Sequence, residues 1–226
     1  TIAALPARAV SASRRARLRI CLVSREFAPF FGGGIGSYAS QMSAALAARG
    51  HEVHILTAPH ENVLREGPKL RPGVTFHAVD FDSGDAALDA YPTYPMRHSM
   101  AVLDALKRLS AEKPFDYIEF PDYNGEGYFT IRAKRTLGLF PRSTLAVRLH
   151  SPGWLCRGED RIAALDAEYA RIEHIERAAV AEADVVVAPA ESVLNRIGLE
   201  PPPFASLEHR PEHVVLPVPI NPYELL

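Results

Sequence analysis

Residues 19–57 are RICLVSREFAPFFGGGIGSYASQMSAALAARGHEVHILT, and they combine a strand, a glycine-rich loop, a helix and a second strand. Residues 18–24 are almost entirely apolar, which is typical of a strand covered on both faces in a parallel sheet. Residues 37–49 carry apolar side chains at helical spacing, and Gly50 is a natural helix stop. A second strand starts at His51. Such βαβ units are parallel and right-handed.

The alternation continues along the chain. We expect further strands at 74–81, 116–120, 144–150, 183–189 and 213–219, and further helices at 97–111, 125–137 and 159–183. This order predicts an α/β fold, a doubly wound and mainly parallel sheet with helices on both faces. Ligands of such folds bind beyond the carboxyl ends of the strands. We therefore look for function in the loops that follow Ser24, Thr57, Phe120, His150 and Pro189.

Composition excludes several classes of function. The 226 residues carry a net charge of -2, so no overall basic field attracts nucleic acid. Two cysteines far apart fit neither a disulfide framework nor a metal cluster, and favour a reducing cytoplasm. No stretch approaches the roughly 20 apolar residues of a membrane span. Residues 1–16 are expected to be a disordered, arginine-bearing arm, either a solvated tail or a peripheral contact with anionic lipid at the inner membrane face.

The glycine cluster at Gly32, Gly33, Gly34 and Gly36 leaves backbone N–H groups uncovered just before a helix, where a phosphate is favoured. A dinucleotide fingerprint starting at Gly34 can be read here, but nine residues separate it from Ser24 and the second strand ends without an acidic residue. We reject the fingerprint. A glycine turn that only serves chain geometry is the alternative.

The same stretch resembles the opening of family 4 glycosyltransferases, retaining enzymes with two Rossmann-like domains (the GT-B architecture). Gly33, Gly34 and Ile35 match the family's Gly-Gly-aliphatic positions, and residues 49–53, RGHEV, match its second segment. The resemblance implies that the Gly33–Gly34 backbone approaches the diphosphate of a nucleotide-sugar donor. It implies no cofactor and no metal beyond this co-substrate.

His150 lies at the end of an expected strand, in the segment RLHSP. A lone histidine is usually structural, but in the family a histidine at this strand end lies beside the transferred sugar and the acceptor. The resemblance therefore makes His150 the candidate catalytic residue, for hydrogen bonding, charge stabilisation or proton movement. Retaining enzymes of this type are thought to use a front-face displacement without an obvious protein nucleophile.

Candidate acceptor contacts lie in two loops. Asp122, Tyr123 and Asn124 follow an expected strand, and their side chains can bind sugar hydroxyls or stack on a sugar ring. Helix capping by Asp122 or Asn124 is an equally good interpretation. Arg25, Glu26 and Phe27 are the parallel candidates in the first loop.

Two metal-like patterns are set aside. Asp80-Phe81-Asp82 spells a metal-diphosphate motif of another glycosyltransferase fold, which the doubly wound pattern does not favour. His51 and His54 lie three residues apart in a strand and therefore point to opposite faces. The sequence predicts no metal site.

Residues 214–222 resemble the segment in which the family's chain crosses into its second domain. We therefore expect an acceptor-side domain at 17–222, the start of the crossover at 223–226, and a missing carboxy-terminal donor-binding domain. A fragment of this kind should be inactive, because half of the cleft is absent. The alternatives are a sugar-nucleotide epimerase or hydrolase of the same architecture, and a non-catalytic binding module.

Overall fold

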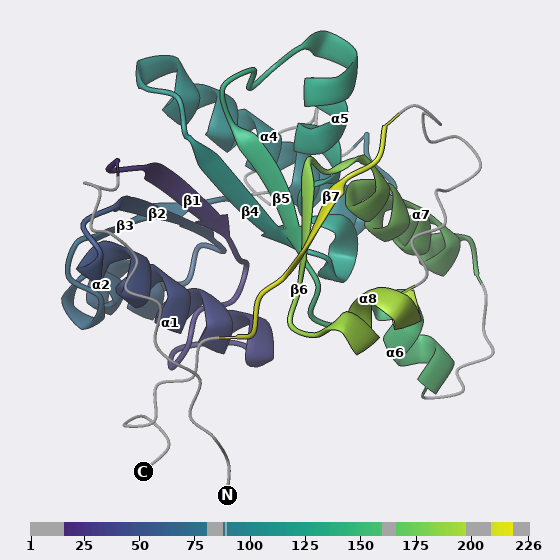
Figure 1. Ribbon diagram of the computed structural model, residues 1–226, viewed down its shortest axis with the longest axis horizontal. Coiled ribbons are helices and arrows are strands. Elements are labelled where there is room, and N and C mark those ends of the chain that lie inside the picture. Colours follow the sequence, from purple (N-terminus) through teal and green to yellow (C-terminus); the bar gives the residue numbers. More distant parts are fainter. Residues whose placement is uncertain (1–15, 81–87, 89, 160–165, 198–208, 219–226) are drawn as a thin grey trace, which may run out of the picture.

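Within the residues that the computed structural model describes, 16–80, 88, 90–159, 166–197 and 209–218, seven strands form one parallel sheet (Figure 1). Their order is β3-β2-β1-β4-β5-β6-β7. The strands are β1 (Arg19–Val23), β2 (Glu52–Thr57), β3 (Val74–Ala78), β4 (Tyr117–Pro121), β5 (Thr144–Arg148), β6 (Val185–Ala188) and β7 (Glu212–Val215). The predicted α/β fold with a parallel sheet is confirmed.

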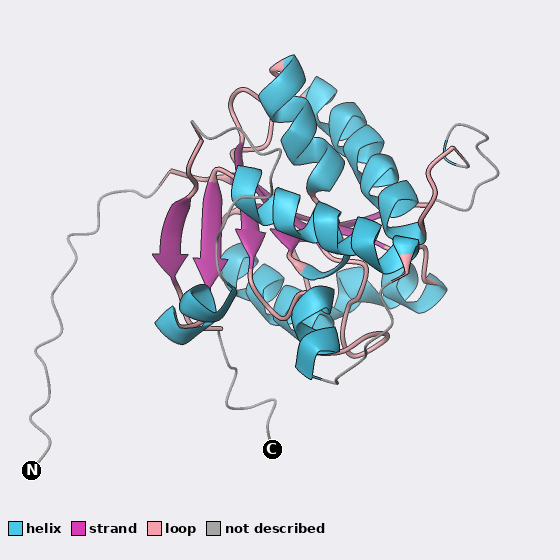
Figure 2. Ribbon diagram, turned by 90° about the vertical axis from the view of Figure 1, so that its right-hand side faces the viewer, coloured by secondary structure: helices cyan, strands magenta, loops and turns pink. Residues whose placement is uncertain are grey.

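Helices cover both faces of the sheet, as Figure 2 shows. On one face α1 (Gly34–Ala48) and α2 (Glu61–Leu70) pack on β1, β2 and β3 around Phe27 and Ile55. On the other face lie α4 (Tyr94–Glu112), α5 (Tyr128–Leu137) and α7 (Ala167–Glu182), around Leu106, Phe120 and Val147. Two short helices, α6 (Gly153–Glu159) and α8 (Glu191–Ile197), and the 3₁₀ turn η1 (Tyr123–Gly125) follow strands.

The strand order places a switch point between β1 and β4. From β1 the chain first builds the sheet outward through β2 and β3, and after α4 it returns to pair β4 with the other side of β1. The connections that leave β1 and β4 therefore diverge to opposite faces of the sheet. In doubly wound folds the crevice at this point is where ligands bind.

The predicted helix at 159–183 is wrong at its start. A separate helix, α6, occupies Gly153–Glu159, and α7 begins at Ala167. The Asp166 side chain accepts a hydrogen bond from the Tyr169 amide at 2.9 Å and caps α7. Apolar spacing alone did not reveal this cap. Residues 160–165 of the predicted helix lie outside the described residues.

Other boundaries also differ from the sequence expectation. The helix expected at 125–137 begins at Tyr128, after η1, and the strand expected at 74–81 ends at Ala78. Helix α2 was not predicted, because Gly67 and Pro68 interrupt it. Pro68 is tolerated in the last turn, and Gly67 packs against Phe76, whose ring lies 2.9 Å from where a Cβ would stand.

The two ends of the domain prediction lie outside the described residues. Residues 1–15 of the expected arm and residues 219–226, which include the expected crossover, are not described. The domain division therefore stays a prediction. Across the described ranges, no helix combines the length and apolar character needed to cross a membrane.

Candidate functional site

The loops that follow β1, β4 and β5 meet at one edge of the sheet. β1 and β5 both pair with β4, with Leu22 opposite Glu119 and Pro121 opposite Arg148. Parallel strands end at the same edge, so the glycine loop, the 122–127 loop and the segment after Arg148 lie side by side. This edge brings together the candidate residues that the sequence placed far apart.

His150 follows β5 and is partly buried. Its backbone N–H donates a hydrogen bond to Oδ2 of Asp122 at 3.0 Å, and its ring packs edge-on against the Tyr38 ring, with the centroids 5.2 Å apart. Burial, and secondarily the Arg148 guanidinium, lower the pKa of His150 to about 4. The imidazole is therefore neutral near pH 7 and can donate through one ring nitrogen while accepting through the other.

Asp122 is fully buried, and burial raises its pKa to about 7. Its carboxylate faces the His150 backbone rather than solvent, so Asp122 supports the position of His150. Sequence reasoning placed an acceptor contact here. The side chain instead lies beneath the loop surface.

Glu176 of α7 is a second fully buried carboxylate at this edge, and its role in the site was not predicted from the sequence. Its Oε1 accepts hydrogen bonds from the amides of Asn124 at 2.8 Å and Gly153 at 2.9 Å, and its Oε2 accepts one from the Trp154 amide at 3.2 Å. Burial raises the pKa of Glu176, against the effect of these hydrogen bonds. One side chain thus ties the loop after β4 to the loop after β5. The sequence signal that could have found Glu176 is its charge at a position that shares one helical face with the apolar residues Ile172 and Ala179.

Tyr123 and Asn124 form η1 and remain partly exposed. Asn124 has φ of 60°, a left-handed conformation that asparagine tolerates better than most residues. Neither Asp122 nor Asn124 is the N-cap of α5, which is Gly127, and the Asp122 side chain makes no capping hydrogen bond to η1. Capping of α5 by these two residues is therefore wrong: the Asp122 carboxylate accepts from the His150 amide, and the backbone amide of Asn124 donates to Glu176.

The glycine loop folds around Glu26. Oε2 of Glu26 accepts a hydrogen bond from the Gly33 amide at 2.8 Å. Gly32 has φ of 99°, and a Cβ at Gly36 would lie about 3 Å from Glu26 and from the backbone of Phe27 and Phe31, so both positions need glycine for structural reasons.

Gly33 and Gly34 are different. A Cβ at Gly33 would approach only Glu26, at 3.9 Å, and a Cβ at Gly34 would meet nothing within 4 Å. Both residues lie at the start of α1, where the first amides have no acceptor within the helix. Packing therefore does not require glycine at these two positions, and the space beside them is open.

A buried ionic cluster supports the floor of the site. Glu119 of β4 accepts hydrogen bonds from the Tyr38 hydroxyl at 2.5 Å and the Tyr117 hydroxyl at 2.7 Å, and it pairs with Arg148 at 3.3 Å. The Arg148 guanidinium stacks over the Tyr38 ring at 4.5 Å. This cluster was not predicted from the sequence, where its only signal is the presence of charged residues within apolar strands. The cluster holds the Tyr38 side chain in place, and the Tyr38 ring in turn packs against the His150 ring.

A second polar cluster borders the loop after β1 on the α4 side. Arg25 donates a hydrogen bond to the Tyr94 hydroxyl at 2.7 Å, and Nε2 of His98 lies 3.5 Å from Oε2 of Glu126. His98 and Glu126 are buried. Of the three neighbours Arg25, Glu26 and Phe27, Phe27 belongs to the core, whereas Arg25 and Glu26 stay partly exposed at this edge.

Within the described part of the chain, the two metal-like patterns contribute no metal site. Among the described residues, no group of three or more His, Cys, Asp and Glu side chains is arranged to hold a metal ion. Asp80 is exposed at the end of β3, and Phe81 and Asp82 lie outside the described residues. His54 contacts His77 and Glu52 rather than His51.

Known structures share this fold at low sequence identity. The catalytic domain of starch synthase IV from Arabidopsis thaliana, bound to ADP and acarbose, is 14% identical over 76% of this chain and 45% of that one, with a TM-score of 0.51. Apo UGT2 from Phytolacca americana is 13% identical over 93% of this chain and 54% of that one, with a TM-score of 0.53. The chain thus spans about half the length of these structures.

Sequence comparisons give a family but no close relative. No curated protein sequence matches the chain. Residues 33–204 match the model of the glycosyl transferase 4-like domain, which covers most of the chain and includes the start of α1, His150 and Glu176. The chain therefore belongs to the glycosyl transferase 4-like domain family, with the Rossmann-like fold of the GT-B glycosyltransferases.

Proposed function

We propose that this chain is the acceptor-side half of a retaining glycosyltransferase, which moves a sugar from a nucleotide-diphosphate donor to a hydroxyl group of a saccharide, lipid or metabolite. The observation that carries the proposal is the contact between Tyr38 and His150, with ring centroids 5.2 Å apart. Tyr38 lies about one turn after Gly34 in α1. The start of α1 and the end of β5 therefore face one space at the switch point.

The donor diphosphate is proposed to lie against the backbone at Gly33 and Gly34. Amides at a helix N-terminus attract phosphate, and no side chain blocks the approach at Gly34. The carboxylate of Glu26 holds the Gly33 amide at 2.8 Å. A diphosphate that binds this amide displaces Glu26, whose carboxylate then becomes available to an acceptor hydroxyl.

His150 is proposed to hydrogen-bond the transferred sugar as a neutral imidazole, because its pKa of about 4 keeps it uncharged at working pH. The buried carboxylates of Asp122 and Glu176 face backbone amides. They are therefore oriented as supports and not as nucleophiles, which fits a front-face displacement. Tyr123 and Asn124, partly exposed beside them, are the proposed acceptor contacts from this loop.

A second domain is part of the proposal, since the chain spans about half of the structures that share its fold. The starch synthase IV structure holds ADP, and a nucleoside diphosphate is the leaving group proposed here. Stabilisation of a departing diphosphate requires donors on both sides of a closed cleft. The isolated chain is therefore expected to show no turnover.

The test uses the natural protein that contains this chain. It is incubated with a panel of nucleotide sugars, with and without hydroxyl acceptors, and the anomeric configuration of the product is read by NMR. Acceptor-dependent consumption with retention supports the proposal. Consumption without acceptor would instead indicate an epimerase or hydrolase, and binding without consumption would indicate a binding module.

Variants connect the activity to the site. His150→Ala should lower kcat about 100-fold or more, which is the usual contribution of a positioned acid, base or hydrogen-bond donor. His174→Ala, at an exposed position of α7, is the matched control and should leave kcat unchanged. Equal activities of the two variants would remove His150 from the mechanism.

A further inference from the structure

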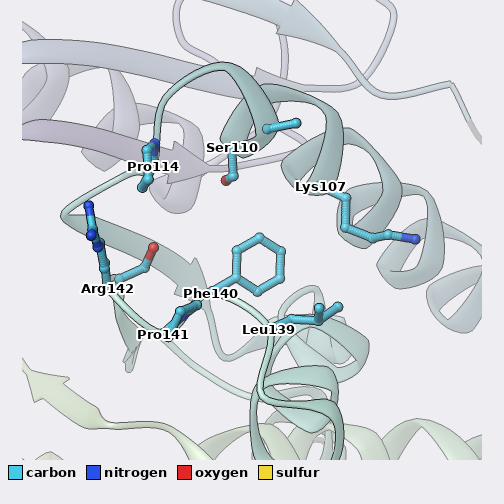
Figure 3. A pocket seen from close by; sticks show the side chains of 9 residues that line it. Lys107, Ser110, Pro114, Leu139, Phe140, Pro141 and Arg142 are labelled. Carbon is cyan, nitrogen blue, oxygen red and sulfur yellow. The ribbon is translucent and has the colours of Figure 1, made fainter.

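A cavity of about 290 Å³ lies away from the switch point, at the opposite edge of the sheet. It is formed by the last turns of α4, by Pro114 before β4, and by the 139–143 loop before β5 (Figure 3). All of these segments precede their strands, whereas His150 and Asp122 follow theirs. The cavity is therefore separate from the proposed transferase site and from any donor bound there.

The walls of the cavity are mainly apolar. Phe140, Leu139 and Pro141 form one side, and Ala111 and Pro114 contribute to the other. In Figure 3 the Ser110 side chain points from α4 into the space between the two sides, and the Phe140 ring lies across from it. The size is close to the lower limit of small-molecule sites, about 300 Å³.

The loop side of the cavity is fastened to the core. The Ser143 amide donates to the Phe140 carbonyl at 3.1 Å, and the Ser143 hydroxyl donates to the Phe115 carbonyl at 2.7 Å. Lys134 donates to the Ser143 carbonyl at 2.6 Å. Phe140 has φ of 55°, an unfavourable conformation that these contacts hold in place. The cavity is thus formed before any ligand arrives, which lowers the entropic cost of binding.

The polar groups of the cavity favour an anion. The nine described residues that line it include no carboxylate. Arg142 lies at its edge and forms no ion pair within the described part of the chain, whereas the Lys107 ammonium is turned away in Figure 3 and pairs with Asp104. Oγ of Ser110 is buried and has no hydrogen-bond partner among the described residues. One cation without an ion pair among the described residues, beside apolar walls, matches a ligand with an apolar body and one anionic group.

We propose that this cavity is a binding site for a small amphiphilic anion, an aromatic or aliphatic carboxylate or sulfonate. Its apolar body packs between Phe140 and Ala111, and its anionic group meets the Arg142 guanidinium at the rim. This site goes beyond the transferase function and does not depend on it. A nucleotide sugar does not fit the same description, because its two phosphates and its hydroxyl groups would lack partners on these apolar walls.

The experiment titrates the full chain with naphthalene-2-carboxylate and follows backbone amides by NMR. The expected result is saturable binding with shifts concentrated in residues 107–111 and 139–143. Ala111→Phe, at an exposed helix position, should fill the cavity and abolish binding without loss of thermal stability. Shifts scattered over the surface, or unchanged binding by a folded Ala111→Phe variant, would overturn the proposal.

Charge recognition is tested separately. Arg142→Gln should raise the Kd for naphthalene-2-carboxylate about fivefold, as expected for the loss of one solvent-accessible ion pair. The neutral analogue 2-naphthalenemethanol should bind both forms equally, and Arg108→Gln, an exposed change on α4 outside the cavity, should have no effect. Inorganic phosphate alone should not bind. Equal loss for the neutral analogue, or phosphate binding as tight as that of the naphthoate, would contradict recognition of an amphiphile.

Discussion

The backbone amide of His150 donates a hydrogen bond to Oδ2 of Asp122 at 3.0 Å, and so the candidate catalytic residue is held by a carboxylate 28 positions earlier in the chain. Asp122 itself has no exposed surface. The neighbouring strands β4 and β5 bring the two residues together at their carboxyl ends. The buried Asp122 side chain thus positions the backbone segment that carries the candidate catalytic residue, His150.

Asp122 should make stability fall as the pH rises. Burial raises its pKa to about 7, above the ordinary value of about 4 that applies in the unfolded chain. Between these values the folded chain binds more protons, so stability is lost on going from pH 4 to 7. Asp122→Asn keeps an acceptor for the His150 amide and removes the titration. In urea unfolding, the free energy of unfolding of the variant relative to that of the unmodified chain should rise by on the order of 2 kcal/mol as the pH goes from 5 to 7.5. A stability difference that does not change with pH would contradict the raised pKa.

Glu176 should tolerate no isosteric replacement. Its two oxygens accept three backbone N–H groups, and in Glu176→Gln an NH₂ group must face at least one of them. The expected cost is about 2 kcal/mol in the free energy of unfolding, since a buried amide loses its acceptor. Glu173→Gln on the same helix breaks partly exposed ion pairs with Arg177 at 2.8 Å and Arg157 at 3.9 Å and should cost less than about 1 kcal/mol. Equal losses would show that the amide contacts contribute little.

Gly34 and Gly36 should respond in opposite ways to alanine. Gly36→Ala places a Cβ about 3 Å from Glu26 and the Phe27 backbone and should cost about 1–3 kcal/mol. Gly34→Ala meets no atom and should stabilise the chain by about 0.5 kcal/mol, through a less flexible unfolded state. In the natural protein Gly34→Ala should nevertheless raise the donor KM, because the added methyl occupies the proposed diphosphate approach. An unchanged KM would leave Gly34 without its proposed role.

The pair of His54 and His77 should make the sheet sensitive to acid. Nδ1 of His54 lies 2.8 Å from Nε2 of His77, and burial lowers the pKa of both rings. Below about pH 6.5 the unfolded chain takes up protons that the folded chain resists, so stability falls as the pH falls. His77→Gln should make this slope shallower between pH 6.5 and 5 in thermal unfolding, and His213→Gln, at an exposed position, should not. Identical slopes for the two variants would argue against the pair.

The sequence predicted the central strands of the sheet well because they are buried on both faces. In β1 all five residues are buried, and such apolar runs are distinctive whatever packs on them. It predicted helix boundaries less well. The α7 start depends on Asp166 as a cap, and α2 contains Gly67 and Pro68, which normally indicate a break. Gly67 is accommodated by Phe76 of β3, a contact that no local pattern reveals.

The candidate site was also predictable only in part. His150, Gly33, Gly34 and Glu26 were selected from strand ends and a family resemblance, and they do lie at one edge of the sheet. Glu176 and the Glu119–Arg148 pair were not selected. A charged residue inside an apolar element is ambiguous in sequence, since most of its partners lie 22 or more positions away along the chain.

The amino-acid sequence by itself determined the alternation of strands and helices, the parallel sheet and the edge at which its loops gather, because apolar periodicity and glycine positions are local properties. Only the tertiary structure decided which carboxylates are buried, which glycines are free of packing, and that His150 is neutral. Those properties depend on desolvation and on partners from other elements. Asp122 is removed from water beneath the His150 backbone, and Glu176 is enclosed by backbone amides of two loops. Gly34 has open space where a side chain would stand, because the Glu26 side chain bonds to Gly33 instead of covering it.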